Sequence, residues 1–220
     1  MAININWGDS TNTGTTLNGT NYFYLSKTYS GNSTYSITLT GSDLTMIKEL
    51  SLSGSNLISC PDFSDIRYDI VILNLDNNLL TTFPTVNSKL RNIYLNNNIL
   101  STSAILKLTS SNLEIIEMTE NSLTGNIPAP SAYIIAYNMS VNSFTGYTQR
   151  GSNFSAYIQA FNDNNLSSTE VNKVLSDNQN YNISESGVID LTGANMGAPN
   201  GQGITDKASL IARGFTIVSN

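Results

Sequence analysis

The sequence predicts an α/β solenoid, a fold in which one structural unit repeats along an axis and each unit adds a short parallel strand. Two observations predict it. A pattern of apolar residues followed by asparagine recurs every 20 to 23 residues, and the 220 residues combine 40% hydrophobic content with only 12% charge. This composition is sufficient for a core, and a repeat of this length is a unit that buries its apolar face against its neighbours.

Each copy of the pattern has an apolar residue, two variable residues, a second apolar residue, one variable residue, a third apolar residue, two variable residues, asparagine, one variable residue and a last apolar residue. The four clean copies are Ile70, Leu73, Leu75, Asn78 and Leu80; Leu90, Ile93, Leu95, Asn98 and Leu100; Leu113, Ile116, Met118, Asn121 and Leu123; and Ile134, Tyr137, Met139, Asn142 and Phe144. A copy with Ser55 in place of asparagine precedes them, and a shortened copy around Asn164 follows.

Over roughly residues 44 to 200 this pattern resembles that of the leucine-rich repeat family. The resemblance implies a leucine-rich repeat solenoid with short parallel strands, a mostly irregular convex side and few helices. Because one repeat cannot bury its apolar face alone, the solenoid needs several copies and a cap at each end.

Alternation along each strand predicts which side chains face a partner. Successive strand residues point to opposite faces, so the apolar residues on either side of the middle variable residue belong to the core. The variable residues are then expected on the concave strand face, where solenoids usually bind partners. The candidate binding residues on this face are Glu49, Ile72, Asn74, Asp76, Asn92, Tyr94, Asn96, Ile115, Glu117, Thr119 and Asn138.

This face mixes amides and carboxylates with aliphatic side chains and one tyrosine. Exposed aliphatic residues on a regular sheet favour contact with another protein. Amides beside Tyr94 also suit a sugar, and a face that is simply solvated is the third alternative.

The asparagine of each copy is expected where the chain turns after the strand. There its amide can bond backbone groups of its own and of neighbouring turns. Stacking of the copies therefore predicts a structural asparagine ladder of Asn78, Asn98, Asn121, Asn142 and Asn164.

The repeats divide the chain into three parts. They are an N-terminal β-sheet cap at 1–43, the solenoid at 44–192 and a C-terminal cap at 193–220. Within the first part, strands are expected at Ile3 to Trp7, Tyr22 to Leu25 and Tyr35 to Leu39, of which the first and last alternate apolar and polar residues. Ile3 to Asp9, Tyr29 to Gly31 and Tyr35 to Gly41 together resemble the second half of a polycystic-kidney-disease-type (PKD) β-sandwich, which implies a β cap that continues into the first repeat.

Two helices are expected in the last third of the chain. Ser167 to Glu170 has the pattern of a capping box before an apolar run. Thr205 and Asp206 are predicted to cap a second helix, which Gly214 ends in the left-handed conformation, and Phe215 to Val218 is predicted to form a final strand.

Composition argues against several classes of function. The chain has no histidine and one cysteine, so it lacks the usual ligand sets of zinc, haem and iron–sulfur sites and the histidine-dependent nucleophile systems. No spacing singles out a pair of carboxylates for acid–base catalysis. We therefore expect no enzyme activity, no catalytic residue, no metal site and no cofactor. Cys60 is expected to be a small buried residue and not a reactive thiol.

Charge and hydropathy restrict the partners. The net charge of −6 argues against nucleic acid, because phosphate contacts need clustered Lys and Arg. No apolar run approaches the roughly 18 residues of a membrane span, so membrane insertion is not expected.

The function is inferred from composition and from a second resemblance. Asn, Ser and Thr account for 83 residues, as in extracellular adhesins, yet the first residues lack the features of a signal peptide. Leu191 to Val218 resembles the ending of leucine-rich repeat proteins of bacteriophages and of Bacteroidota-type bacteria.

The resemblance implies a non-enzymatic virion protein of the tail, fibre or capsid, made in the host cytoplasm without a signal peptide and oligomeric within an assembly. Its partners would be other virion proteins or a host surface receptor or glycan. The alternative is a soluble or surface bacterial leucine-rich repeat protein that mediates protein–protein interaction in the bacterial cytoplasm or at the cell surface.

Overall fold

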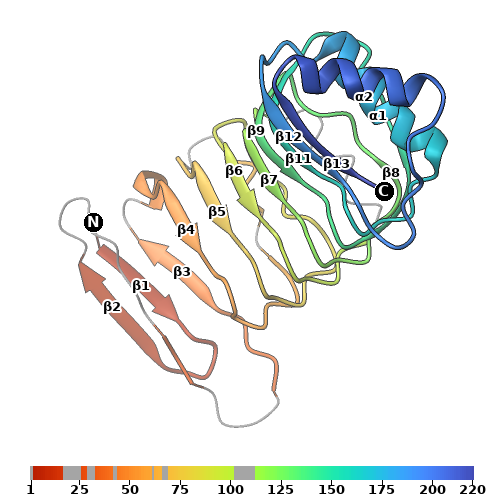
Figure 1. Cartoon of the computed structure of the whole chain (residues 1–220). Coiled ribbons are helices and arrows are strands. Elements are labelled where there is room, and N and C mark those ends of the chain that lie inside the picture. The colour runs from red at the N-terminus through yellow and green to blue at the C-terminus, as the bar shows by residue number, and fades with distance from the viewer. Residues whose placement is uncertain are drawn as a thin grey trace.

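The chain folds into a solenoid of mostly parallel strands, as the repeat predicts (Figure 1). The computed structural model describes residues 2–16, 26–28, 33–41, 44–60, 62–65, 69–101 and 112–220. Within these ranges the coils follow one another along one axis, with a small sheet at the N-terminal end and both α-helices at the other end. The helices are few, as expected.

Eight strands form the main sheet, in the order β13-β12-β11-β9-β7-β6-β5-β4. Their bounds are β4 Glu49–Ser51, β5 Ile72–Asn74, β6 Asn92–Tyr94, β7 Ile115–Glu117, β9 Tyr133–Asn138, β11 Ser155–Ala160, β12 Gly187–Leu191 and β13 Phe215–Ser219. All neighbours in this sheet are parallel, and the repeats are in register, so that Leu73 lies beside Ile93 and Ile93 beside Ile116.

The core lies behind the main sheet and consists of the apolar positions of the repeat. Leu73, Leu75, Ile93 and Leu95 are fully buried. Burial of a side chain of this size contributes roughly 1.5–3 kcal/mol relative to leaving it in water. The same positions in later coils belong to the same continuous core, so each coil is stabilised mainly by its neighbours.

The side opposite the main sheet is largely irregular in the described residues, with one addition that the sequence did not indicate. Strand β8, Thr124–Ile127, pairs in parallel with β10, Ser143–Tyr147, in a second, two-stranded sheet. Ile127 and Phe144 are fully buried, so these strands close the core of their coils from behind. A short 3-10 helix, η1, spans Leu44–Met46.

Helix α1, Ser168–Tyr181, begins where the sequence predicts. Ser167 is its N-cap, and the hydroxyl of Ser167 accepts a hydrogen bond from the N–H of Glu170. The Glu170 carboxylate does not reach back to complete a capping box. It accepts instead from the N–H of Tyr147, at 2.9 Å, and from Lys173, so it ties the helix to β10.

Helix α2, Gln202–Ala212, begins earlier than predicted, and Thr205 and Asp206 lie inside it rather than at its cap. The first turn of α2 packs closely against α1. A Cβ atom at Gly203 would lie 1.9 Å from the Asn172 side chain, so a glycine at this position permits the contact between the two helices. The predicted end is confirmed: Gly214 has a φ of +101°.

The last coil closes the main sheet and is anchored by Arg213. Strand β13 pairs with β12 along its whole length, which confirms the predicted final strand. The Arg213 guanidinium donates to the carbonyl oxygens of Asn182 and Ser184, just beyond α1, and lies over the ring of Phe215. Residues 193–220 therefore extend the same sheet as the preceding coils.

The N-terminal part contains a separate antiparallel sheet in the order β2-β1-β3. Its strands are β1 Ala2–Asn6, β2 Asn12–Thr16 and β3 Thr38–Gly41, of which β2 was not predicted. In the described residues this sheet shares no paired strand with the main sheet, so the predicted continuation into the first repeat is not a continuous ladder. The strand expected at Tyr22 to Leu25 and the segment Tyr29 to Gly31 lie outside the described residues.

Candidate binding face

The outer face of the main sheet, which points away from the core, carries all eleven predicted binding residues. Three positions of the repeat supply them. Glu49, Ile72, Asn92 and Ile115 share the first position; Asn74, Tyr94, Glu117 and Asn138 share the position two residues later; and Asp76, Asn96 and Thr119 follow the strands. Glu49 is exposed and the other ten are half-buried, so every one of them reaches the surface.

The polar residues after the strands connect neighbouring coils. The Asp76 carboxylate accepts from the N–H of Asn96 at 2.6 Å, and the Asn96 side-chain oxygen accepts from the N–H of Thr119 at 2.8 Å. The Asn74 and Asn138 side chains accept from backbone N–H groups two residues further on. These oxygens satisfy backbone donors at the strand ends, so this edge of the face has a structural role as well as an exposed surface.

Tyr94 lies at the centre of the polar half of the face. Burial raises the pKa of its hydroxyl, and the carboxylates of Glu117 and Asp76 raise it further. Burial also raises the pKa of Asp76, and the hydrogen bond from the N–H of Asn96 lowers it by a smaller amount. The site thus presents an aromatic ring and a neutral hydroxyl beside carboxylates.

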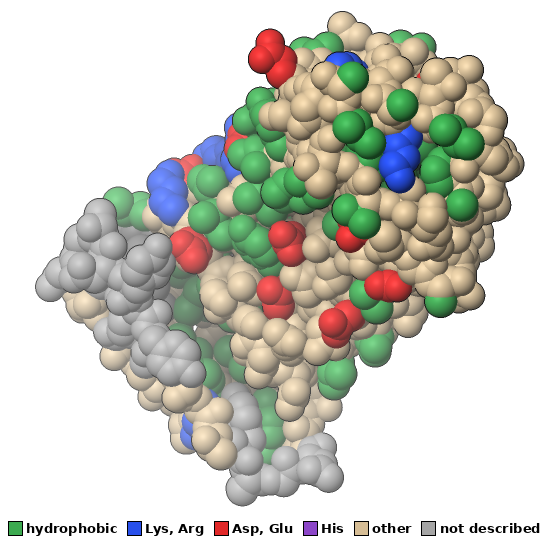
Figure 2. Space-filling view, in the orientation of Figure 1, with side chains coloured by type: hydrophobic (Ala, Val, Ile, Leu, Met, Phe, Trp, Pro, Cys, Tyr) green, Lys and Arg blue, Asp and Glu red, His purple; other side chains and the backbone are tan. Residues whose placement is uncertain are grey.

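An apolar column crosses the same face. It follows the first position of the repeat across the sheet and consists of Ile72, Ile115, Ile158 and Val188, interrupted by Asn92 on β6 and by buried Ala136 on β9. Ile158 and Val188 are 45% and 42% exposed. Figure 2 shows hydrophobic side chains gathered in a band over β5–β7, with separate acidic side chains around it. Exposed apolar patches of this kind are typical of interaction sites.

Two tyrosines extend the exposed apolar surface at β9 and β11. Tyr133 and Tyr157 are 47% and 41% exposed, and their rings meet edge to face with centroids 6.3 Å apart. Neither tyrosine was among the candidate residues, and neither were Ile158 and Val188. The pairing of β9, β11 and β12 aligns Ile158 and Val188 with Ala136, and Tyr157 directly precedes Ile158. Tyr133 and Tyr157 lie at strand positions outside those of the repeat from which the candidates were drawn.

Behind the face, the five predicted ladder asparagines lie in the turns that follow the strands. Asn78, Asn98, Asn142 and Asn164 are buried, and Asn121 is half-buried. Each donates its amide to the third apolar residue of its own repeat and to that of the preceding one. The acceptors are the carbonyls of Leu52, Leu75, Leu95, Met118, Met139 and Phe161. Inner carbonyls are therefore shared by two successive asparagines, which fixes the spacing of the coils.

The residue before each ladder asparagine has a positive φ, between 50° and 56°. Asparagine, which tolerates this conformation, supplies two of these positions, but Glu120 and Val141 supply two others. A β-branched valine with a φ of 52° is strained, so the surrounding coil dictates its conformation.

Charged side chains flank the face at the beginnings of its first strands. Lys48 lies 2.6 Å from Asp69, Lys89 also bonds Asp69, and Arg91 pairs with Glu114. The Lys48 ammonium, and then that of Lys89, lower the pKa of Asp69 to about 2. Exposed pairs of this kind contribute little to stability, so they mainly define the border of the face.

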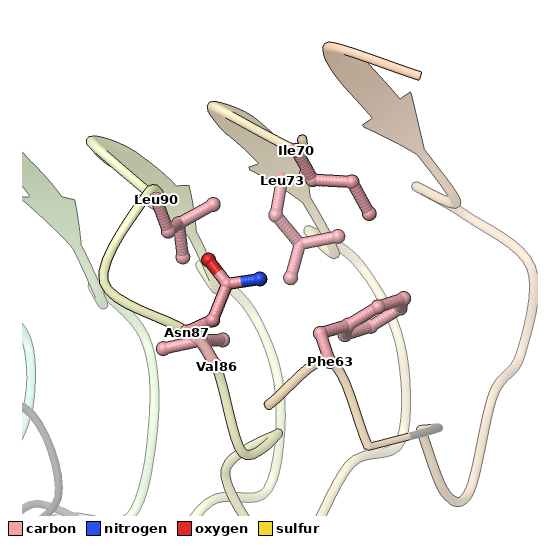
Figure 3. Close-up of a pocket in the computed structure, with 6 residues that line it drawn as sticks. All are labelled: Phe63, Ile70, Leu73, Val86, Asn87 and Leu90. Atoms are coloured by element: carbon pink, nitrogen blue, oxygen red, sulfur yellow. The ribbon is translucent and has the colours of Figure 1, made fainter. Parts of the chain in front are cut away.

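A cavity of about 10 Å³ lies between two coils, with room for at most one water molecule. Its lining, shown in Figure 3, is Phe63, Ile70, Leu73, Val86, Asn87 and Leu90. The Asn87 amide there donates to the carbonyl of Asp65 and accepts from the N–H of Lys89, so its hydrogen bonds serve the fold.

Potential metal ligands do not converge in the part of the chain that the structure describes: no group of three or more His, Cys, Asp or Glu side chains lies together. Burial raises the pKa of the Cys60 thiol to about 12. Of the helices in the described ranges, none is long and apolar enough to cross a membrane.

Comparison with known proteins finds no match for this chain among protein families, curated proteins or solved structures.

Proposed function

We propose that this chain is a non-enzymatic binding protein of the leucine-rich repeat type whose main-sheet face docks onto another protein. The apolar column of Ile72, Ile115, Ile158 and Val188, set among amides and carboxylates, carries this proposal. Stable interfaces combine an apolar centre with a polar rim, and tyrosine is enriched at their energetic centres. Tyr94 supplies such a residue within the polar half of the face.

Three features support the leucine-rich repeat type. The period is 20 to 23 residues, each central coil adds one short parallel strand, and the ladder asparagines bond the backbone of two successive coils. The sheet of β1–β3 is proposed as the cap of the N-terminal end. Buried Trp7, whose indole N–H donates to Thr13 at 2.9 Å, is the centre of that small unit.

A glycan is the second candidate ligand, because Tyr94 stands between amide and carboxylate side chains. Asn74 and Glu117 are its register neighbours on β5 and β7, and Asn92 belongs to the same strand. A sugar ring stacks on an aromatic face while its hydroxyls bond such groups. Protein binding depends on the whole apolar column, whereas glycan binding depends on Tyr94 and its amides, so substitutions separate the two.

The proposed setting is a bacteriophage particle, in which the chain is an oligomeric tail, fibre or capsid-associated component that binds other virion proteins or a host receptor. Support comes from the resemblance of Leu191 to Val218 to the ending of phage leucine-rich repeat proteins and from the adhesin-like content of Asn, Ser and Thr. Mass spectrometry of purified particles tests this: absence of the chain from them would leave the bacterial interaction protein as the better proposal.

A site-specific photo-crosslinker tests the binding face. Placed at Ile115, it should link one defined protein of the native assembly, whereas the same crosslinker at Thr145, exposed on β10, should not. Ile115→Lys should weaken the interaction at least tenfold, because it places a charge against a desolvated apolar surface. Equal labelling from both positions would refute the proposal. Loss of binding with Tyr94→Ala but not with Ile115→Lys would favour a glycan.

A further inference from the structure

Strand β13 leaves one edge of the main sheet open. It pairs with β12 on one side, and the described strands include none on its other side. Backbone N–H and C=O groups along that edge therefore lack a sheet partner, which makes the edge a template for another strand.

The edge of β13 lacks the usual protection. Sheet edges are normally kept from pairing by short strands, charges, proline or bulges. The opposite edge, β4, has such protection: it spans three residues, and Lys48 and Glu49 stand at its beginning. Phe215–Ser219 spans five residues, contains neither charge nor proline, and pairs with β12 without a bulge.

The coil that ends in β13 also exposes apolar side chains that inner coils would bury. On α2, Ile204 and Ile211 are 58% and 49% exposed, and Ala208 and Ala212 lie at helical spacing on the same face. On β13 itself, Val218 is 46% exposed. Capping repeats of solenoids normally carry a polar outer face, and this coil does not.

The charge distribution favours a second copy as the partner. The chain has a net charge of −6, so two copies repel each other over most approaches. The last coil, residues 193–220, is the exception, because its charged residues are Asp206, Lys207 and Arg213, whose formal charges sum to +1, whereas the rest of the chain carries −7. This weakly charged end with exposed apolar side chains is where a second copy of the acidic chain meets the least repulsion, and a basic partner would find no complementary negative surface there.

We infer that two copies of this chain dimerise by antiparallel pairing of β13 with β13, which joins their main sheets across a two-fold axis. Pairing centred on Ile217 uses all five residues of each strand and keeps the outer faces of the two sheets on the same side. In that register Thr216 of one copy stands opposite Val218 of the other, on the outer face. The inference concerns the strand edge and does not rest on the proposed function of the face.

Sedimentation of the full chain tests the dimer. The wild type should have twice the monomer mass of 23.8 kDa at all protein concentrations from about 1 to 100 µM. A weak dimer would dissociate within this range, so a constant mass shows tight association. Thr216→Lys with Val218→Lys sets lysine against lysine across the axis and should weaken dimerisation at least tenfold. Ser152→Lys with Asn153→Lys adds the same charge in an exposed loop and should leave the dimer intact.

A charge-swapped variant fixes the register and controls for misfolding. Thr216→Glu with Val218→Lys pairs opposite charges across the proposed axis, so its dimer should be at least tenfold tighter than that of the double-lysine variant. A monomeric wild type, a dimer insensitive to the double-lysine change, open-ended larger species, or no recovery in the charge-swapped variant would each overturn the inference. Far-ultraviolet circular dichroism should show the same fold in all four proteins.

Discussion

Replacement of Asn98 with leucine tests the hydrogen bonding that holds the coils in register. Leucine keeps roughly the volume of the side chain and removes its polar atoms. Asn98 is 6% exposed, and its oxygen accepts from the N–H of Leu80 at 3.0 Å. Its amide donates to the carbonyls of Leu75, Leu95 and Asn96 at 3.0, 3.2 and 3.2 Å.

The four lost hydrogen bonds do not have equal effects. Each of the three carbonyls keeps another donor; these donors are the amides of Asn78 and Asn121 and the backbone N–H of Asn77. Leu80 is different, since Asn98 is the one acceptor found for its N–H within the described residues. A buried donor left without an acceptor costs about 1–3 kcal/mol, so Asn98→Leu should lower the free energy of unfolding by about 2 kcal/mol.

Urea unfolding followed by circular dichroism measures this loss, because the free energy falls linearly with denaturant. Asn153→Leu is the matched control, since Asn153 is exposed and its substitution should change stability by less than about 0.5 kcal/mol. If Asn98→Leu were no more destabilising than this control, the ladder would not hold the coils. A loss above about 5 kcal/mol would show that the carbonyls do not keep their second donors.

Backbone strain, charge and thiol burial give the other predictions. Val141→Asn should raise the free energy of unfolding by about 1 kcal/mol in the same urea assay, because asparagine tolerates the positive φ better; an unchanged value would refute strain there. In carboxyl NMR titrations the midpoint of Asp69 should lie near a pKa of about 2, and that of Asp76 above its ordinary pKa of 3.8. Since the folded pKa of Asp69 is lowered, its contribution to stability is present above about pH 4 and lost as the pH falls towards 2; the raised pKa of Asp76 has the opposite sign, and stability falls as the pH rises through it. Midpoints in the reverse order would contradict both assignments. Cys60, whose pKa is raised to about 12, should react with a thiol reagent at pH 8 far more slowly in the folded than in the urea-unfolded chain; equal rates would show an open site.

The positions of the repeat were readable because each has one physical requirement. Leu73 and Ile93 must be apolar since they are fully buried, and the residue between two such positions must tolerate water. Asparagine recurs where both a donor and an acceptor are needed in one turn, as at Asn98. The columns of the outer face followed from this register, and so did the placement of Tyr94 beside Glu117.

Other features lacked a local signal. Nothing in Glu120 or Val141 indicates a positive φ, because neighbouring coils impose it. Gly203 lies in the first turn of α2, where a larger side chain would collide with Asn172, and a glycine by itself does not indicate such a helix contact in the sequence. The partner of the face is not encoded in the same way. Side chains of different polarity at Ile115 or Asn92 would be compatible with the same fold, so these residues indicate a surface but not its ligand.

The strands of the main sheet are longer at the C-terminal end of the solenoid than at its N-terminal end. Strands β4–β7 span three residues each, whereas β9 and β11 span six and β12 and β13 five, and both α-helices pack at that same end. A solenoid is held together coil by coil, so thermal opening should start in the early coils and advance towards the late ones. Synthesis runs from the N-terminus, so the less stable early coils leave the ribosome before the more stable late coils. The early coils must therefore wait, exposed, until the late coils are made and give them a folded surface on which to stack.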